Sequence, residues 1–156
     1  WVTQVRTLEA LRKLGWDNDY IAWGHLEAEA ELVRLKDGKF YVVNSNALFE
    51  DGLPIQKEID AAAKQAGSKY PGQTMTEGWI GGMAIEAALK AAGTGADRAK
   101  LRGAMENLTI DTKGLRGGPI VWTKDNHFRT QLYYRVYKWD GSKISRVQDW
   151  KNYAVK

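Results

Sequence analysis

The sequence predicts an α/β fold with one core. Helical and strand-like segments alternate along residues 2–46, residues 76–92 are apolar almost all round as in a buried helix, and residues 132–139 alternate as in a β-strand. With 156 residues and 44% hydrophobic content, the chain is long enough for one hydrophobic core but not for two complete domains.

The first element expected is a helix over residues 2–14. Its apolar positions recur at helical spacing: Val2, Val5, Leu8, Leu11 and Leu14. Gly15 follows where a left-handed residue commonly ends a helix. Residues 20–23, Tyr-Ile-Ala-Trp, form a short apolar run, which predicts a parallel strand covered on both faces.

A second helix is expected from about Leu26 to Lys36, with Gly38 stopping it. Its first turns contain three glutamates, where the positive end of the helix dipole favours acidic side chains. Residues 40–43, Phe-Tyr-Val-Val, predict another buried strand, which ends at the turn-forming residues 44–46. The order helix, strand, helix, strand is typical of an α/β fold.

Three more helices are expected, over residues 55–66, 76–92 and 98–108. Asp97 can cap the last of them. Their predicted core positions include Ile55, Ile59, Ala62, Ala66, Leu101, Ala104, Met105 and Leu108. The helix over residues 76–92 is expected to be the most buried, and its glycines at 78, 81 and 82 suggest a face that another backbone approaches closely.

The chain then predicts a glycine-rich turn at 114–118, a short strand at 119–122 and a β-hairpin that turns at Asp140-Gly141. The hairpin interleaves aromatic and basic residues over 133–151. One interpretation is a surface that stacks nucleic-acid bases or sugars. The other is that half of the aromatic side chains face a core while the cations protect an exposed edge from aggregation.

Composition excludes several classes of protein. The sequence has no cysteine, which removes disulfides, thiol catalysis and cysteine-based metal sites. The formal net charge of +4 is spread along the chain, which favours a solvated surface over a polyanion site. No apolar run approaches the roughly 20 residues that span a bilayer. Because the chain begins at Trp1 without methionine, we expect it to be part of a longer polypeptide.

Candidate chemical groups are few. His25 follows a predicted parallel strand, and ligands of open α/β sheets gather at the carboxyl ends of strands, so residues 23–27 form a candidate binding loop. The alternative is a solvated turn histidine with a helix-dipole glutamate. His127 with Asp125 is the sole basis for a hydrolase, and Arg116 between glycines is either an anion site or a plain turn residue. No spacing suggests a metal site, and no cofactor is predicted.

The order of segments from Leu8 to Trp150 resembles the leucine/isoleucine/valine-binding type of periplasmic solute-binding protein, the receptors of branched-chain amino-acid ABC transporters. The matching segments cover nearly the whole chain. They are EALRKLG at 9–15, GW at 78–79, AALKAAG at 87–93, residues 101–108, GPI at 118–120, His127 and YKWDG at 137–141.

The resemblance implies the type I periplasmic binding protein fold, two Rossmann-like lobes with parallel sheets, of which this chain is the C-terminal portion. Residues 1–49 would belong to the C-terminal lobe, 50–128 would cross into the N-terminal lobe, and the hairpin over 129–156 would return. The N-terminal portion, with its signal peptide and several ligand-binding loops, would lie upstream. The protein would be periplasmic, or extracytoplasmic and lipid-anchored in a Gram-positive host.

The resemblance also implies a non-enzymatic receptor that closes over a small solute and hands it to ABC permease subunits. In one lobe, the candidate ligand-binding residues are Trp23, Gly24, His25 and Glu27; in the other, they are Met75 and Glu77. No carboxylate occupies the position that meets the amino end of the family's ligands, and Glu27 is the nearest. An aromatic or carboxylate-bearing solute therefore suits Trp23 and His25 better than an α-amino acid does.

Overall fold

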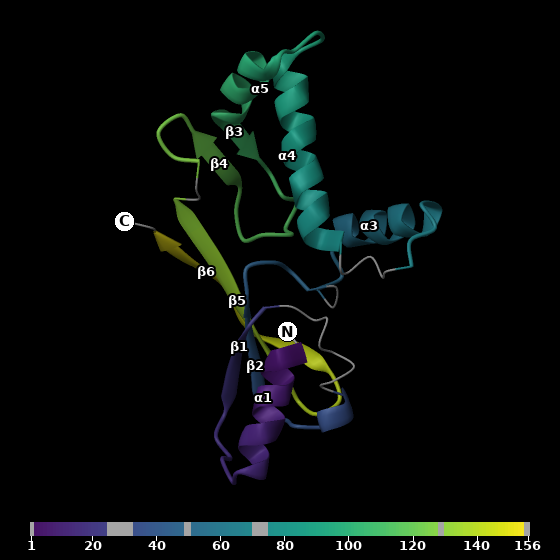
Figure 1. Ribbon diagram of the computed structural model, residues 1–156, viewed down its shortest axis with the longest axis vertical. Coiled ribbons are helices and arrows are strands. Elements are labelled where there is room, and N and C mark those ends of the chain that lie inside the picture. Colours follow the sequence, from purple (N-terminus) through teal and green to yellow (C-terminus); the bar gives the residue numbers. More distant parts are fainter. Residues whose placement is uncertain (1, 25–32, 49–50, 70–74, 128–129, 155–156) are drawn as a thin grey trace. The chain divides into compact units, whose positions relative to one another are not determined.

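The computed structural model describes residues 2–24, 33–48, 51–69, 75–127 and 130–154 (Figure 1). Its helices are α1 (Val2–Lys13), α3 (Pro54–Gln65), α4 (Thr76–Ala92) and α5 (Arg98–Met105). Its strands are β1 (Tyr20–Trp23), β2 (Phe40–Asn44), β3 (Asn107–Ile110), β4 (Ile120–Thr123), β5 (Gln131–Trp139) and β6 (Ile144–Ala154). The mixed helices and strands confirm the predicted α/β class.

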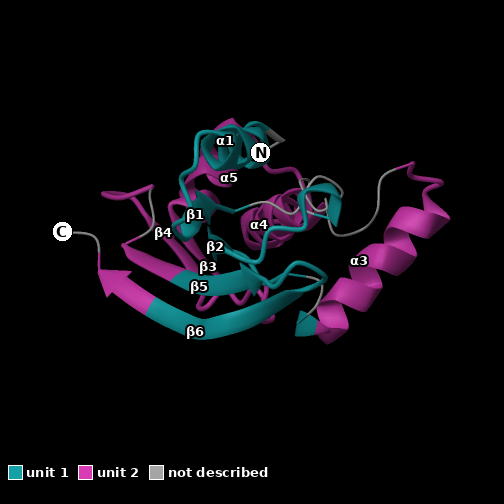
Figure 2. Cartoon of the chain, turned by 90° about the horizontal axis from the view of Figure 1, so that it is seen from below, with its two compact units in different colours: residues 1–51, 134–151 teal, residues 52–133, 152–156 magenta. Residues whose placement is uncertain are grey.

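The chain divides into two compact units (Figure 2). Unit 1 comprises residues 1–51 and 134–151, and unit 2 comprises residues 52–133 and 152–156. The polypeptide therefore passes from one unit to the other three times, after residues 51, 133 and 151. The second and third crossings lie within strands β5 and β6.

Unit 1 contains a four-stranded sheet in the order β1-β2-β5-β6. Strand β1 pairs with β2 in parallel, as predicted, and β2 pairs with β5 antiparallel. Helix α1 contributes two fully buried side chains to the core of this unit, and its end at Gly15 (φ +83°) is confirmed. The core consists of Val5, Leu8, Ala22, Phe40, Val42, Leu48, Tyr137, Trp139 and Ile144.

The prediction that strand 20–23 is covered on both faces is wrong for the described chain. Ala22 is buried, but Ile21 and Trp23 on the opposite face are 69% and 50% exposed. The predicted second helix falls largely on residues 25–32, which lie outside the described residues; residues 33–35 are helical. Lys36, with φ +54°, and not Gly38, takes the left-handed conformation after them. Gly38 instead packs closely on the backbone of Asp140.

Unit 2 is built on α4, which contacts α3, α5 and β3. The structure corrects the predicted end of the last helix. Helix α5 begins after Asp97, whose side chain accepts a hydrogen bond from the Lys100 N–H, but it ends at Met105. Residues 107–110 form strand β3, which pairs antiparallel with β4. Thr109 and Ile110 are β-branched residues, which favour strands, and both pair with residues of β4. Leu108 is buried as predicted, but it is part of this strand and not of the helix.

The burial of the helices in unit 2 is less extensive than the sequence predicts. In α3, Ile55 and Ile59 are buried as expected, but the third core position is Ala63 and not Ala66. In α4, one stripe is buried and consists of Thr76, Ile80, Ala84 and Ala88. On the other side, Ile85 and Leu89 are at least half exposed. A Cβ atom on any of the α4 glycines would meet nothing within 4 Å, so the predicted close backbone approach is absent from the described part of the chain.

The hairpin buries one face of β5, and this decides between the two interpretations of its aromatic residues. Arg135, Tyr137 and Trp139 are buried, so Tyr137 and Trp139 are not available to stack bases or sugars. The expectation that the basic residues protect an exposed edge is wrong for Arg135, which lies within the polar network described below. The Asp140-Gly141 turn forms as predicted, with Gly141 at φ +98°. Among the described residues, no helix is both long and apolar enough to cross a membrane.

Candidate functional site

In unit 1, two of the predicted site residues lie at the carboxyl end of β1. Trp23 is half exposed, and its ring meets that of Tyr134 edge to face with the centroids 5.1 Å apart. The backbone N–H of Gly24 donates to the Val43 carbonyl at 2.8 Å, which continues the parallel pairing with β2. The other two candidates, His25 and Glu27, lie outside the described residues. Trp23 therefore presents an aromatic face where ligands of α/β sheets are bound.

Gly24 is required by a close contact. A Cβ atom at this position would lie 2.6 Å from Oδ1 of Asn44. That oxygen accepts a hydrogen bond from the backbone N–H of Asn46 at 3.1 Å, and both asparagines are buried. The amide side chain at the end of β2 therefore occupies the space that a larger residue at position 24 would need.

We expect Gly24→Ala to lower the free energy of unfolding by about 1–3 kcal/mol, because the new methyl group would displace the Asn44 side chain from Asn46. Denaturant unfolding measures the change. The matched control is Gly78→Ala, where a Cβ atom meets open space within a helix. That substitution should be neutral or stabilising by up to about 1 kcal/mol. Equal losses in both variants would contradict the steric role of Gly24.

In unit 2, the predicted residues Met75 and Glu77 lie at the start of α4. The Glu77 carboxylate, half exposed, accepts a hydrogen bond from Nη2 of Arg116 at 2.7 Å. Arg116 is buried, and its backbone N–H donates to the Thr112 hydroxyl at 3.1 Å. The backbone of Arg116 is thus held by its own loop, and its guanidinium is balanced by Glu77. It is not the isolated anion site that the sequence allowed.

Met75 also lines a pocket of about 630 Å³ along α4. The pocket is lined by Met75, Gly78, Trp79, Gly82, Met83 and Glu86. The side chains are apolar apart from Glu86, and the glycines leave the helix backbone accessible. Unit 2 therefore contributes a carboxylate at Glu77 and, beside it, an open apolar surface.

A buried network that the sequence analysis missed lies in unit 1 and is centred on Asp51. Its Oδ2 atom accepts hydrogen bonds from the Tyr137 hydroxyl at 2.6 Å, from Nη1 of Arg135 at 3.0 Å and from the Leu48 N–H at 3.1 Å. Nε of Arg135 donates to Asp149 at 2.8 Å. The side chains of Asp51 and Arg135 are only 7% and 9% exposed.

The network joins residues that border each chain crossing. Asp51 is the last residue of unit 1 before the first crossing, Arg135 follows the second by one residue, and Asp149 precedes the third. The Arg135 guanidinium also lies over the Trp150 ring, 4.2 Å from its centroid. The network therefore ties together the unit 1 ends of the three crossing segments. Sequence patterns gave no signal of it because its hydrogen bonds join residues that are distant in the sequence, such as Asp51 and Tyr137, which are 86 positions apart.

Burial, together with the hydrogen bond to Asp51, raises the pKa of Tyr137 above its ordinary value of 10.0. A raised pKa means that the folded state binds this proton more tightly than the unfolded state does. The contribution to stability is therefore complete below pH 10 and is lost as the pH rises toward the folded-state pKa. We expect Tyr137→Phe to reduce this alkaline loss in denaturant unfolding measured from pH 8 to 11. Tyr153→Phe, on an exposed side chain, should leave it unchanged.

The residues considered for catalysis do not assemble into a catalytic group. Nε2 of His127 lies 3.5 Å from Oε1 of Glu106, which identifies Glu106 and not Asp125 as its acidic neighbour. Glu106 also accepts a hydrogen bond from Arg102, which with His127 lowers the pKa of its carboxyl. Within the described ranges, no three histidine or acidic side chains come close enough to hold a metal ion.

Comparison with known proteins gives the family. The model of the family described as "Periplasmic binding protein" matches residues 2–143. A crystal structure of an ABC transporter permease from the Pseudomonas fluorescens group is similar over 96% of this chain and 41% of that chain, with a TM-score of 0.66 and 15% identity. At this identity the similarity shows the fold alone. A search of curated proteins found no match. Because the family match spans most of its length, the chain belongs to the periplasmic binding protein family.

Proposed function

We propose that this chain is the C-terminal portion of a solute-binding receptor of an ABC importer, which holds an amino acid, an amide or a small aromatic acid in a cleft between two lobes. The family match over residues 2–143 is the observation that carries the proposal. The leucine/isoleucine/valine-binding type is the finer assignment, and the order of the segments quoted above supports it.

We assign the two compact units to the two lobes. Unit 1, residues 1–51 and 134–151, would correspond to the part of the C-terminal lobe predicted at 1–49 and 129–156. Unit 2, residues 52–133 and 152–156, would correspond to the segment predicted at 50–128 in the N-terminal lobe, so the two divisions differ at residues 50–51, 129–133 and 152–156. Three crossings of the chain between the units support this assignment, because a hinge of a few crossing segments permits two lobes to close on a ligand. The similar solved chain is more than twice as long, which supports a longer whole protein.

The proposed ligand-binding residues come from both units. Trp23 and Gly24 would contact the solute from unit 1, with His25 and Glu27 in the loop that follows, and Met75 and Glu77 would contact it from unit 2. Trp23 offers a half-exposed ring for an apolar or aromatic body, and Glu77 offers a carboxylate for an ammonium or amide group. An aromatic contact on one side and a charged contact on the other would fix the orientation of a small polar solute.

The proposed partners are the solute, ABC permease subunits and the N-terminal portion of the same protein, with no nucleic acid. Family membership supports an extracytoplasmic location, either periplasmic or lipid-anchored in a Gram-positive host. It also supports a receptor that releases its solute unchanged. No cofactor is needed for this function.

A thermal-shift screen of the full-length protein tests the proposal. Amino acids, their amides and small aromatic acids would be added singly, and the solution would be assayed for chemical change. We expect at least one compound to raise the unfolding temperature with a saturable dose dependence, since a ligand that binds only the folded state stabilises it. The compound should be recovered intact. If all compounds leave the unfolding temperature unchanged, or if a hit is converted to product, the proposal is wrong.

A further inference from the structure

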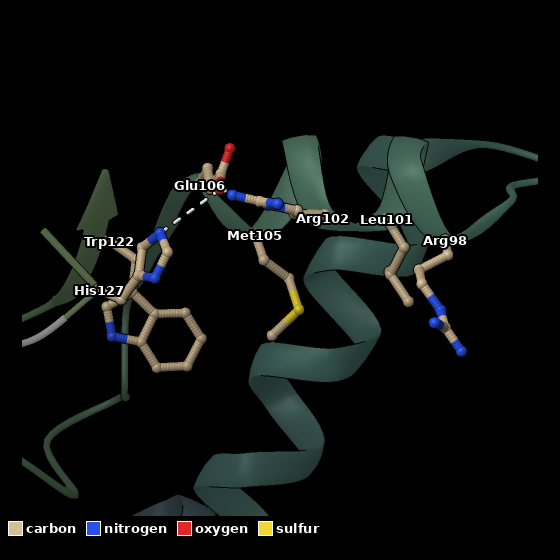
Figure 3. A pocket seen from close by; sticks show the side chains of 7 residues that line it. All are labelled: Arg98, Leu101, Arg102, Met105, Glu106, Trp122 and His127. Carbon is tan, nitrogen blue, oxygen red and sulfur yellow. Dashed lines mark hydrogen bonds and ion pairs between the residues drawn. The ribbon is translucent and has the colours of Figure 1, made fainter. Parts of the chain in front are cut away.

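A second pocket lies within unit 2, on α5 and β4 (Figure 3). Its volume is about 420 Å³, within the range of small-molecule sites. It is lined by Arg98, Leu101, Arg102, Met105, Glu106, Trp122 and His127. None of these residues is among those proposed to bind the solute.

The floor of this pocket is apolar. Leu101 and Met105 project from α5 on the side where the Trp122 ring stands, as Figure 3 shows. A thioether and an indole accommodate flat or branched apolar groups well, because sulfur and aromatic rings attract one another at contact distance. The floor therefore suits an aromatic ring or a branched aliphatic group.

The two ends of the pocket rim differ in whether their charged side chains are paired. At one end, the carboxylate of Glu106 is held by Nε of Arg102 at 2.7 Å and lies 3.5 Å from His127. Lys124 adds a further positive charge near this carboxylate. At the other end, Arg98 has no carboxylate within ion-pair distance among the residues that the structure describes. The one acidic group is thus already balanced, and the available charge is the Arg98 guanidinium.

We propose that this pocket is a second ligand site, which takes a small monocarboxylate with an aromatic or branched apolar body. The carboxylate would bind Arg98, and the apolar body would lie on Met105 and Trp122. Guanidinium groups bind carboxylates through paired, charge-assisted hydrogen bonds, and the apolar floor supplies the burial that an exposed ion pair lacks. A neutral ligand of the same shape keeps the burial but loses the contact with Arg98.

The methionines of the chain provide a direct readout. There are three; Met105 lines this pocket, whereas Met75 and Met83 line the pocket along α4. The full-length protein would be labelled at the methionine methyl groups, the Met105 signal assigned with Met105→Leu, and phenylacetate titrated in NMR spectra. We expect the Met105 methyl signal to shift saturably. Any shift of the Met75 signal, from phenylacetate in the proposed solute cleft, should follow a separate dose dependence that Arg98→Gln leaves unchanged.

Two comparisons test the role of charge. Phenylacetamide, a neutral isostere, should bind about tenfold more weakly than phenylacetate, and Arg98→Gln should weaken phenylacetate binding by a similar factor. Arg6→Gln, an exposed arginine on α1, is the matched control and should change nothing. The proposal is overturned if the Met105 signal does not shift, if the amide binds as well as the acid, or if Arg98→Gln and Arg6→Gln behave alike.

Discussion

Replacement of Asp51 by alanine should lower the free energy of unfolding by about 3–5 kcal/mol, the cost of breaking a buried ion pair by removing one partner. Asp51 accepts hydrogen bonds from Arg135, Tyr137 and the Leu48 N–H. Its loss would leave the Arg135 guanidinium, 9% exposed, with the solvent-facing Asp149 as its acidic partner. Denaturant unfolding of the full-length protein measures the change.

Asp149→Ala is the matched control, since it removes a carboxylate from the same arginine. The Asp149 side chain is 67% exposed, and surface ion pairs contribute at most about 1 kcal/mol. The two variants should therefore differ by at least about 2 kcal/mol. Similar losses in both would mean that burial of Asp51 does not determine the strength of the network.

Trp23→Ala should weaken binding of the solute by about hundredfold, equivalent to about 2.7 kcal/mol, because aromatic anchors dominate the energetics of binding sites. The effect on stability should be small. The ring is half exposed and contacts the Tyr134 ring edge to face. Calorimetric titration of the full-length variant with the solute found in the screen gives the affinity, and denaturant unfolding gives the stability.

Ile21→Ala is the control for this prediction. Ile21 lies two residues earlier on β1, so its side chain is on the same face of the strand, and it is 69% exposed. It is not among the proposed ligand-binding residues, and its truncation should leave the affinity within about twofold of the parent value. An affinity that falls equally in both variants would point to a general effect of this face of the strand and would contradict a specific role for Trp23.

Local sequence patterns predicted most of the helices and strands, because these elements depend mainly on residues that are neighbours in the sequence. Residues 76–92 form α4 with the bounds that the small-residue pattern gave, and residues 20–23 form the parallel strand β1. The prediction failed at residues 107–110. There, Leu108 continues a helical spacing, but pairing with β4 turns the segment into a strand. Such pairing is a tertiary contact that overrides local propensity.

The burial of faces could be predicted less well. An apolar stripe indicates that a face is suited to burial, but it does not say which segment covers it. The stripe at Ile85 and Leu89 on α4 and the pair Ile21 and Trp23 on β1 are apolar in sequence and exposed in the described chain.

The sequence also indicated some features of the candidate site and not others. Sequence reasoning proposed Trp23 and Gly24 from the end of a predicted strand and from the family resemblance, and Met75 and Glu77 from the resemblance alone. The structure gives Gly24 a steric reason and Glu77 a partner in Arg116. The ligand-binding roles of all six candidate residues, including His25 and Glu27 outside the described residues, stay predictions. The Asp51 network was beyond the reach of sequence patterns, since hydrogen bonds between Asp51 and residues 135 and 137 depend on the folded path of the chain.

The proposal that one small solute contacts both units can be tested by parallel calorimetric titrations of the full-length protein and two variants. Trp23→Ala probes unit 1 and Glu77→Gln probes unit 2. We predict a single one-to-one binding event in the parent protein, weakened by either substitution, with the solute recovered unchanged. If either variant binds the solute as tightly as the parent does, the solute is held by one unit alone and the two-lobed receptor is contradicted.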